Sequence, residues 1–119
     1  MSKPIIVLDF DGVIHSYKSG WKGINDIPDL PVDGVKVFIK ELRENYQVYI
    51  LSSRSALPHG VYAIEEWLKK YGIKVDKIVA HKPPAFITID DRCICFKGSF
   101  DGLLEQIKSF KSWTNKGNI

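Results

Sequence analysis

The sequence predicts a single α/β domain with a mostly parallel central sheet and helices on both of its faces. Segments with strand character alternate along the chain with segments of helical apolar periodicity, which is the pattern of such a sheet. The chain has 119 residues, of which 45% are hydrophobic and 26% are charged, as in one ordinary globular domain. We therefore expect a three-layer fold that spans residues 1–119 as one unit.

The first predicted strand covers residues 4–9 and contains an uninterrupted apolar run. It leads into an irregular segment, residues 12–31, that is rich in Gly, Pro, Ser and Asn. A loop this long in so small a domain is usually functional. Its aromatic residue Trp21 is expected either to anchor the loop internally or to contact a ligand.

Two helices and one strand are predicted in the middle of the chain. The first helix, residues 33–45, has an apolar stripe at helical spacing that we expect in the core: Val35, Phe38, Ile39 and Leu42. Residues 47–51 form the second strand. The second helix, residues 59–71, ends before Gly72, which suits the left-handed C-terminal cap. Its inward side chains are expected to be Val61, Ile64, Trp67 and Leu68.

The last third of the chain is predicted to add the remaining strands and a last helix. A third strand lies within residues 73–80, a fourth covers residues 86–89, and residues 94–96 are a candidate fifth. The last helix, residues 100–113, is expected to pack on the sheet through Leu103, Leu104, Ile107, Phe110 and Trp113. Residues 114–119 have no apolar periodicity and are expected to fray.

Charge, cysteine content and hydropathy narrow the classes of function. The net charge of +3 comes with scattered lysines, which suits an anionic substrate and does not predict nucleic-acid binding. Cys93 and Cys95 are expected to be reduced thiols in or near the core, because alternation on a strand does not give disulfide geometry. The sequence shows neither a signal peptide nor an apolar stretch of about 18 residues. We therefore expect a soluble, cytoplasmic protein that does not associate with membranes.

Two carboxylates one residue apart follow the first strand. In an extended segment residues i and i+2 share a side, so Asp9 and Asp11 can converge while Phe10 packs inward. Gly12 then allows the backbone to turn sharply and a ligand to approach it. Carboxylates this close favour a divalent cation or one protonated carboxyl group. Taken alone, the motif is equally consistent with a functional site and with an Asp-Gly turn that ends a strand.

Further polar residues lie near the ends of two other strands. They are Ser52, Ser53 and Arg54 after the second strand, Lys82 just before the fourth, and Asp90 and Asp91 after the fourth. Open α/β sheets bind ligands at the carboxyl ends of their strands, so we expect these groups in one crevice. Each also has a structural alternative, because a serine can terminate a strand, a lysine or arginine can be a solvated charge, and an aspartate can cap a turn. His15, on the loop after the first acids, either contacts substrate or is structural.

The order of these residues resembles the four motifs of the haloacid dehalogenase superfamily of phosphohydrolases. The first motif, Asp-x-Asp-Gly-x, matches residues 9–13, and the second, a Ser or Thr after an apolar strand, matches Ser52, with Ser53 as the alternative. The third, a lysine, matches Lys82, which lies closer to the fourth motif than in many members. The fourth, an acidic pair after an apolar strand, matches Asp90 and Asp91. The resemblance covers residues 4–112 and implies a Rossmann-like domain of the small, capless type.

The resemblance implies two-step hydrolysis of a phosphate monoester. Asp9 is then the nucleophile that forms an aspartyl-phosphate, and Asp11 protonates the leaving oxygen and later deprotonates the attacking water. Magnesium is held by Asp9, by Asp11 through its main-chain carbonyl, and by Asp90, with Asp91 completing or orienting this set. Ser52 and Lys82 hold the phosphoryl oxygens, and the candidates for further substrate contacts are Gly12, His15, Ser53 and Arg54.

The length of the chain affects which substrates could reach the site. The two intervals that hold cap domains in larger members have no room for one here. An open site suits a bulky phosphorylated partner, such as a nucleic-acid end or a phosphoprotein, unless another subunit covers it. A nucleotide or sugar phosphate is the alternative substrate. A phosphotransferase and a non-catalytic phosphate-binding module of the same fold are the alternative functions.

Overall fold

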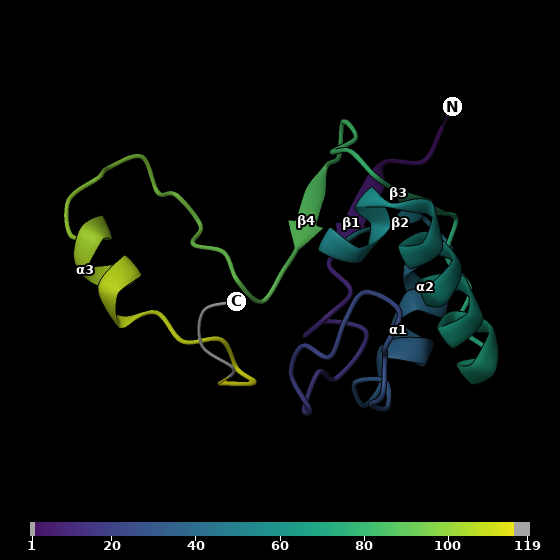
Figure 1. The fold of residues 1–119 in the computed structure, drawn as a ribbon. Coiled ribbons are helices and arrows are strands. Elements are labelled where there is room, and N and C mark those ends of the chain that lie inside the picture. The colour runs from purple at the N-terminus through teal and green to yellow at the C-terminus, as the bar shows by residue number, and fades with distance from the viewer. Residues whose placement is uncertain (1, 116–119) are drawn as a thin grey trace.

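The computed structural model describes residues 2–115 and has the predicted α/β architecture, a single Rossmann-like domain (Figure 1). Its four strands are β1 (Ile5–Leu8), β2 (Gln47–Leu51), β3 (Lys77–Val79) and β4 (Ile87–Ile89). Its helices are α1 (Val35–Leu42), the 3-10 turn η1 (Ser53–Ala56), α2 (Pro58–Tyr71) and α3 (Leu103–Ser109). The strands form one parallel sheet in the order β3-β2-β1-β4, so the predicted parallel topology is confirmed.

β1 lies inside the sheet, between β2 and β4. Ile6 of β1 pairs with Val48 of β2 and with Ile87 of β4, and the register continues along the three strands. Because all strands run in the same direction, their carboxyl ends meet at one edge of the sheet. Directly after β1, Asp9 donates its backbone N–H to the carbonyl of Ile89 at 2.9 Å, so the first acidic residue lies beside the end of β4.

α1 and α2 lie side by side on one face of the sheet (Figure 1). They connect β1 to β2 and β2 to β3 in the same direction, and right-handed crossovers then put both helices on the same side. The buried core beneath them includes Ile6, Leu8, Val48 and Ile50 from the strands, Val35 and Ile39 from α1, and Ile64, Trp67 and Leu68 from α2. Phe38 was predicted in this core, but it is 44% exposed, because at about 100° per residue it lies to one side of the buried Ile39 on α1.

The ends of α2 follow local sequence signals. Pro58 occupies the first turn, where a missing N–H leaves no helical hydrogen bond unmade. Gly72 ends the helix with a φ of 67°, the left-handed conformation predicted for it. α2 therefore has nearly the predicted bounds.

The C-terminal part of the chain differs from the prediction. The last helix is confined to α3, none of its residues is buried, and it lies apart from the sheet (Figure 1). Residues 94–96 form no strand, and Trp113 lies outside the helix and is 58% exposed. Cys93 and Cys95 are free, exposed thiols instead of core residues. Apolar periodicity marks one face of a helix, but it does not specify the surface against which that face packs.

Two further sequence predictions concern the tail and the membrane. Most of the tail predicted to fray, residues 116–119, lies outside the described residues. Within residues 2–115, no helix combines the length and the apolar character that crossing a membrane requires.

Candidate active site

Three carboxylates meet at the carboxyl edge of the sheet. Asp9 follows β1, and Asp90 and Asp91 follow β4, the strand that pairs with β1. One oxygen of each side chain lies within 4.8 Å of the other two, close enough for all three to contact one cation. The fold therefore brings Asp9 together with Asp90 and Asp91, which are about 80 residues away in the sequence.

Gly12 makes room for this acid cluster of Asp9, Asp90 and Asp91. Its φ of 87° is a left-handed conformation that glycine adopts without strain. A Cβ at this position would overlap the carboxylate of Asp91. Any other residue would therefore displace Asp91 from the cluster.

Burial and mutual repulsion oppose full ionisation of the acid cluster. Burial, the charge of Asp90 and a hydrogen bond with Asp91 together raise the pKa of Asp9 to about 8. Burial also raises the pKa of Asp91, whose Oδ1 is buried without a hydrogen-bond partner among the described residues. A cation bound by this oxygen would stabilise the charged carboxylates. Oxygen ligands of this kind fit a hard divalent ion such as Mg²⁺.

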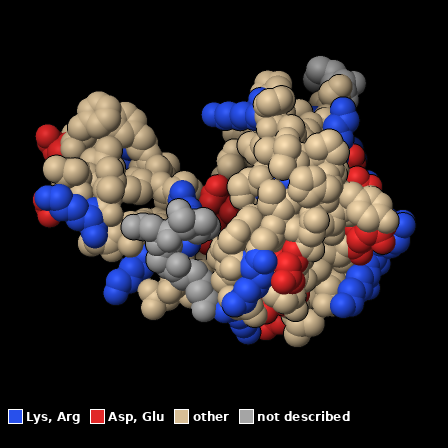
Figure 2. Space-filling view, viewed as in Figure 1, with Lys and Arg blue, Asp and Glu red and all other residues tan. Residues whose placement is uncertain are grey.

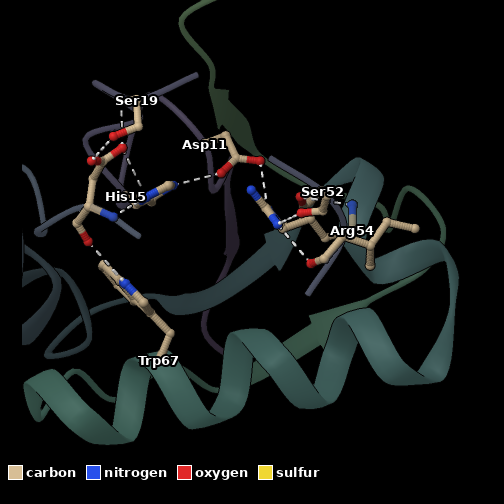
Figure 3. Close-up of polar contacts among 9 residues, drawn as sticks. Asp11, His15, Ser19, Ser52, Arg54 and Trp67 are labelled. Carbon is tan, nitrogen blue, oxygen red and sulfur yellow. Dashed lines mark hydrogen bonds and ion pairs between the residues drawn. The ribbon is translucent and has the colours of Figure 1, made fainter. Parts of the chain in front are cut away.

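The side chain of Asp11 is bound to other partners (Figure 3). Arg54 donates from Nε to Oδ2 at 2.9 Å, and Nδ1 of His15 lies 2.8 Å from Oδ1. Nε2 of His15 accepts the backbone N–H of Asp29 at 3.1 Å, so in the neutral ring Nδ1 carries the proton and donates it to Asp11. The carboxylate of Asp11 is thus not one of the three clustered acids. Its main-chain carbonyl is left as the atom with which it could bind a metal.

Of the two alternatives for His15, the structure favours the structural one. Its side chain is fully buried, between the ring of Phe10 at 5.7 Å and the ring of Trp67 at 5.6 Å from centroid to centroid. The buried ring is thus not accessible to a substrate, and its Nδ1 holds the carboxylate of Asp11 in place.

Arg54 is buried, so it is neither a solvated charge nor part of an open rim. Besides Asp11, it binds the loop after β1, because Nη1 donates to the carbonyls of Gly23 and Ile24 at 2.7 Å each. Its guanidinium carbon lies 4.6 Å from the ring centroid of Trp21, in a cation–π contact. Arg54 therefore links the end of β2 to the long loop and to Asp11, and Trp21 anchors the loop internally.

The two candidates for the second-motif hydroxyl differ in exposure. Ser52 is buried, and its Oγ accepts the backbone N–H of Arg54 at 3.1 Å, which caps η1. This contact uses the oxygen as an acceptor and leaves the hydroxyl proton to donate. Ser53 is exposed on η1.

The structure does not bring the third-motif residue into contact with the acids. The side chain of Lys82 is exposed in the segment between β3 and β4, and it makes no hydrogen bond or ion pair with any described residue. Its predicted contact with phosphoryl oxygens remains a prediction.

Trp113 is a site residue that the sequence did not indicate. Its indole Nε1 donates to the carbonyl of Gly12 at 2.5 Å, although the two residues are 101 positions apart. It also lines a pocket together with Gly12, Val13, Val32, Ile89, Asp90 and Asp91. No local pattern could have revealed this contact, because it depends on where the C-terminal segment returns to the domain.

Comparison with known proteins shows the fold. No protein-family model matches the chain, and neither does any curated protein. A conserved protein from Bacteroides thetaiotaomicron is similar in structure, with 21% identity, a TM-score of 0.58 and coverage of 99% of this chain and 100% of that one. A chain of the Pnkp1/Rnl/Hen1 RNA repair complex matches with 19% identity and a TM-score of 0.50. That match covers 94% of this chain and 33% of the other, so the chain spans about a third of that protein.

Proposed function

We propose that this protein is a magnesium-dependent phosphohydrolase that acts on a phosphate monoester through an aspartyl-phosphate intermediate. The observation that carries the proposal is the meeting of Asp9, Asp90 and Asp91 at the carboxyl edge of the sheet. The partly buried Asp9 also lies where ligands bind in open α/β sheets. The resemblance to the four haloacid dehalogenase motifs supports the same reaction class.

In the proposed reaction, a carboxylate oxygen of Asp9 attacks phosphorus in line with the ester oxygen. A bond forms between this oxygen and phosphorus, the bond to the ester oxygen breaks, and Asp11 gives the leaving oxygen a proton. Water then attacks the aspartyl-phosphate and loses a proton to Asp11, which releases phosphate. Magnesium, when bound by the acid cluster, offsets the repulsion between carboxylates and phosphate.

The contacts of Asp11 suit an acid–base role. Hydrogen bonds with Arg54 and His15 hold its two oxygens in a fixed orientation before substrate binds. In the second step this carboxylate takes the proton from the attacking water.

Hydrolysis of an aryl phosphate tests the proposal. The protein should turn over the ester with Mg²⁺, and chelation should abolish turnover. Asp9→Asn removes the nucleophile at nearly constant volume and should reduce turnover to that of buffer. Asp33→Asn is the matched control, since Asp33 is an exposed acid outside the cluster, and this variant should keep full activity. An Asp9→Asn protein that is folded and fully active would exclude Asp9 as the nucleophile.

The alternative functions give different results in the same assay. A phosphotransferase would form a new phosphate ester when an acceptor alcohol is added, and this product is separable from free phosphate. A non-catalytic module would bind Mg²⁺ and phosphate without turnover. A panel of nucleotides, sugar phosphates, a phosphoprotein and oligonucleotides phosphorylated at the 3′ or 5′ end would then identify the substrate class.

A further inference from the structure

A line of polar groups beneath the surface connects α2 to Asp11. Figure 2 shows lysine, arginine and acidic side chains spread over the surface of the protein, whereas the side chains of His15 and Trp67 are only 0% and 6% exposed. Burial of a polar group costs free energy unless the group is hydrogen-bonded. The hydrogen bonds of these two side chains are therefore costly to break.

Three hydrogen bonds form this line (Figure 3). The indole Nε1 of Trp67 donates to the carbonyl of Asp29 at 3.2 Å. The backbone N–H of Asp29 donates to Nε2 of His15 at 3.1 Å. Nδ1 of the same ring lies 2.8 Å from Oδ1 of Asp11. We call this set of residues the positioning network: Trp67, Asp29, His15 and Asp11.

The direction of each bond in the positioning network is fixed by its donor. An indole nitrogen and a backbone amide can only donate, so neither of their bonds can reverse. Nε2 of His15 must then accept from Asp29, and the proton of the neutral ring is on Nδ1, where it faces Asp11. If the backbone of Asp29 moved away, the proton could move to Nε2, and Asp11 would lose this donor.

Ring contacts fix the plane of His15 as well. Phe10 stacks on the imidazole with a centroid distance of 5.7 Å and an angle of 21° between the planes. Trp67 meets the imidazole edge-on, at 5.6 Å and 76°. Trp67 thus holds His15 twice, directly through its ring and, by way of Asp29, through its N–H. The plane of the imidazole and the position of its proton therefore both depend on this residue of α2.

We propose that Trp67 is a positioning residue for Asp11. Its indole N–H fixes the main chain of Asp29, and this backbone amide in turn orients His15 toward Asp11. The inference rests on the proposed function, in which the proton of Asp11 moves to the ester oxygen as the bond between that oxygen and phosphorus breaks. Such a transfer depends on position, since a displacement of about 1 Å can cost about 100-fold in rate.

Two aryl phosphates with different leaving groups test this role. The leaving oxygen of phenyl phosphate needs a proton, whereas that of dinitrophenyl phosphate departs without one. The ratio kcat/KM reports the first chemical step, in which this proton is transferred. Trp67→Phe removes the N–H and keeps an aromatic ring, so kcat/KM should fall about tenfold for phenyl phosphate and stay nearly unchanged for the dinitrophenyl ester. His15→Phe should show the same selectivity with a larger loss, about 100-fold.

The comparison of the two esters separates positioning from packing. A buried indole N–H needs an acceptor in any protein, so a purely structural role of Trp67 predicts the same loss for both esters. Tyr71→Phe is the matched control, because it removes a polar group from the ring that lies 4.8 Å from that of Trp67, outside the positioning network. This variant should keep both rates.

The tautomer of His15 gives a readout that needs no substrate. The side-chain nitrogen chemical shifts of His15 should place the proton on Nδ1 in the wild-type protein, and folded Trp67→Phe should contain both tautomers. A proton on Nε2 in the wild-type protein would exclude the positioning network outright. An inactive wild-type enzyme would exclude the proposed function and this inference with it. Equal losses for both esters, or an unchanged tautomer in folded Trp67→Phe, would exclude the inference alone.

Discussion

Arg54→Met should lower the free energy of unfolding far more than the loss of a solvent-exposed ion pair does. The guanidinium of Arg54 is buried and makes three short hydrogen bonds, one to Asp11 at 2.9 Å and two to the carbonyls of Gly23 and Ile24 at 2.7 Å. Methionine keeps much of the side-chain length but leaves these acceptors without the cation. Removal of one partner from a buried ion pair costs about 3–5 kcal/mol. The side chain of Asp11 retains 13% exposure, so we expect a loss near the lower limit, about 3 kcal/mol.

A second arginine provides the control. Arg43 pairs with Asp76 at a similar distance, 3.0 Å, but the two side chains are 35% and 29% exposed. Arg43→Met should therefore cost no more than about 1 kcal/mol. Urea unfolding followed by circular dichroism gives both values, and equal losses for the two variants would refute the argument from burial. In the double variant Arg54→Met/Asp11→Asn, the losses should be less than additive, because the uncompensated charge is also removed.

Three further predictions concern the acid cluster and the residues beside it. The pKa of Asp9 is raised in the folded protein from the ordinary aspartate value of 3.8 to about 8, so the folded chain holds an additional proton between these values. Without metal, stability should therefore fall as the pH rises from about 4 to about 8. Thermal melts in a chelator should show this slope, and Mg²⁺ or Asp9→Asn should remove most of it. Gly12→Ala should weaken Mg²⁺ binding, measured by calorimetry, at least tenfold (about 1.4 kcal/mol), because its Cβ displaces Asp91; unchanged affinity would contradict the packing argument. Trp113→Phe should lower the free energy of unfolding by about 1 kcal/mol, and an unchanged urea midpoint would show that its hydrogen bond to Gly12 contributes nothing.

The parallel sheet, its four strands and the acids that follow them could be predicted from the sequence, although the candidate fifth strand at residues 94–96 does not form. These features are local, because a short apolar run defines a strand and the next residue lies at its carboxyl end. Parallel pairing then brings Asp9 to Asp90 and Asp91 without any information from side-chain packing. The left-handed cap at Gly72 was predictable for the same reason, since its conformation depends on neighbouring residues alone.

The environment of each side chain, by contrast, depends on contacts between residues far apart in the sequence. The burial of Arg54 depends on the loop carbonyls of Gly23 and Ile24, about 30 residues earlier, which no local pattern locates. The periodicity around α3 predicted an apolar face that packs on the sheet, but none of the residues of α3 is buried, because periodicity does not specify the surface against which a helix packs. The hydrophobic effect is non-directional. An apolar pattern therefore shows which residues are buried, but not which residues they contact.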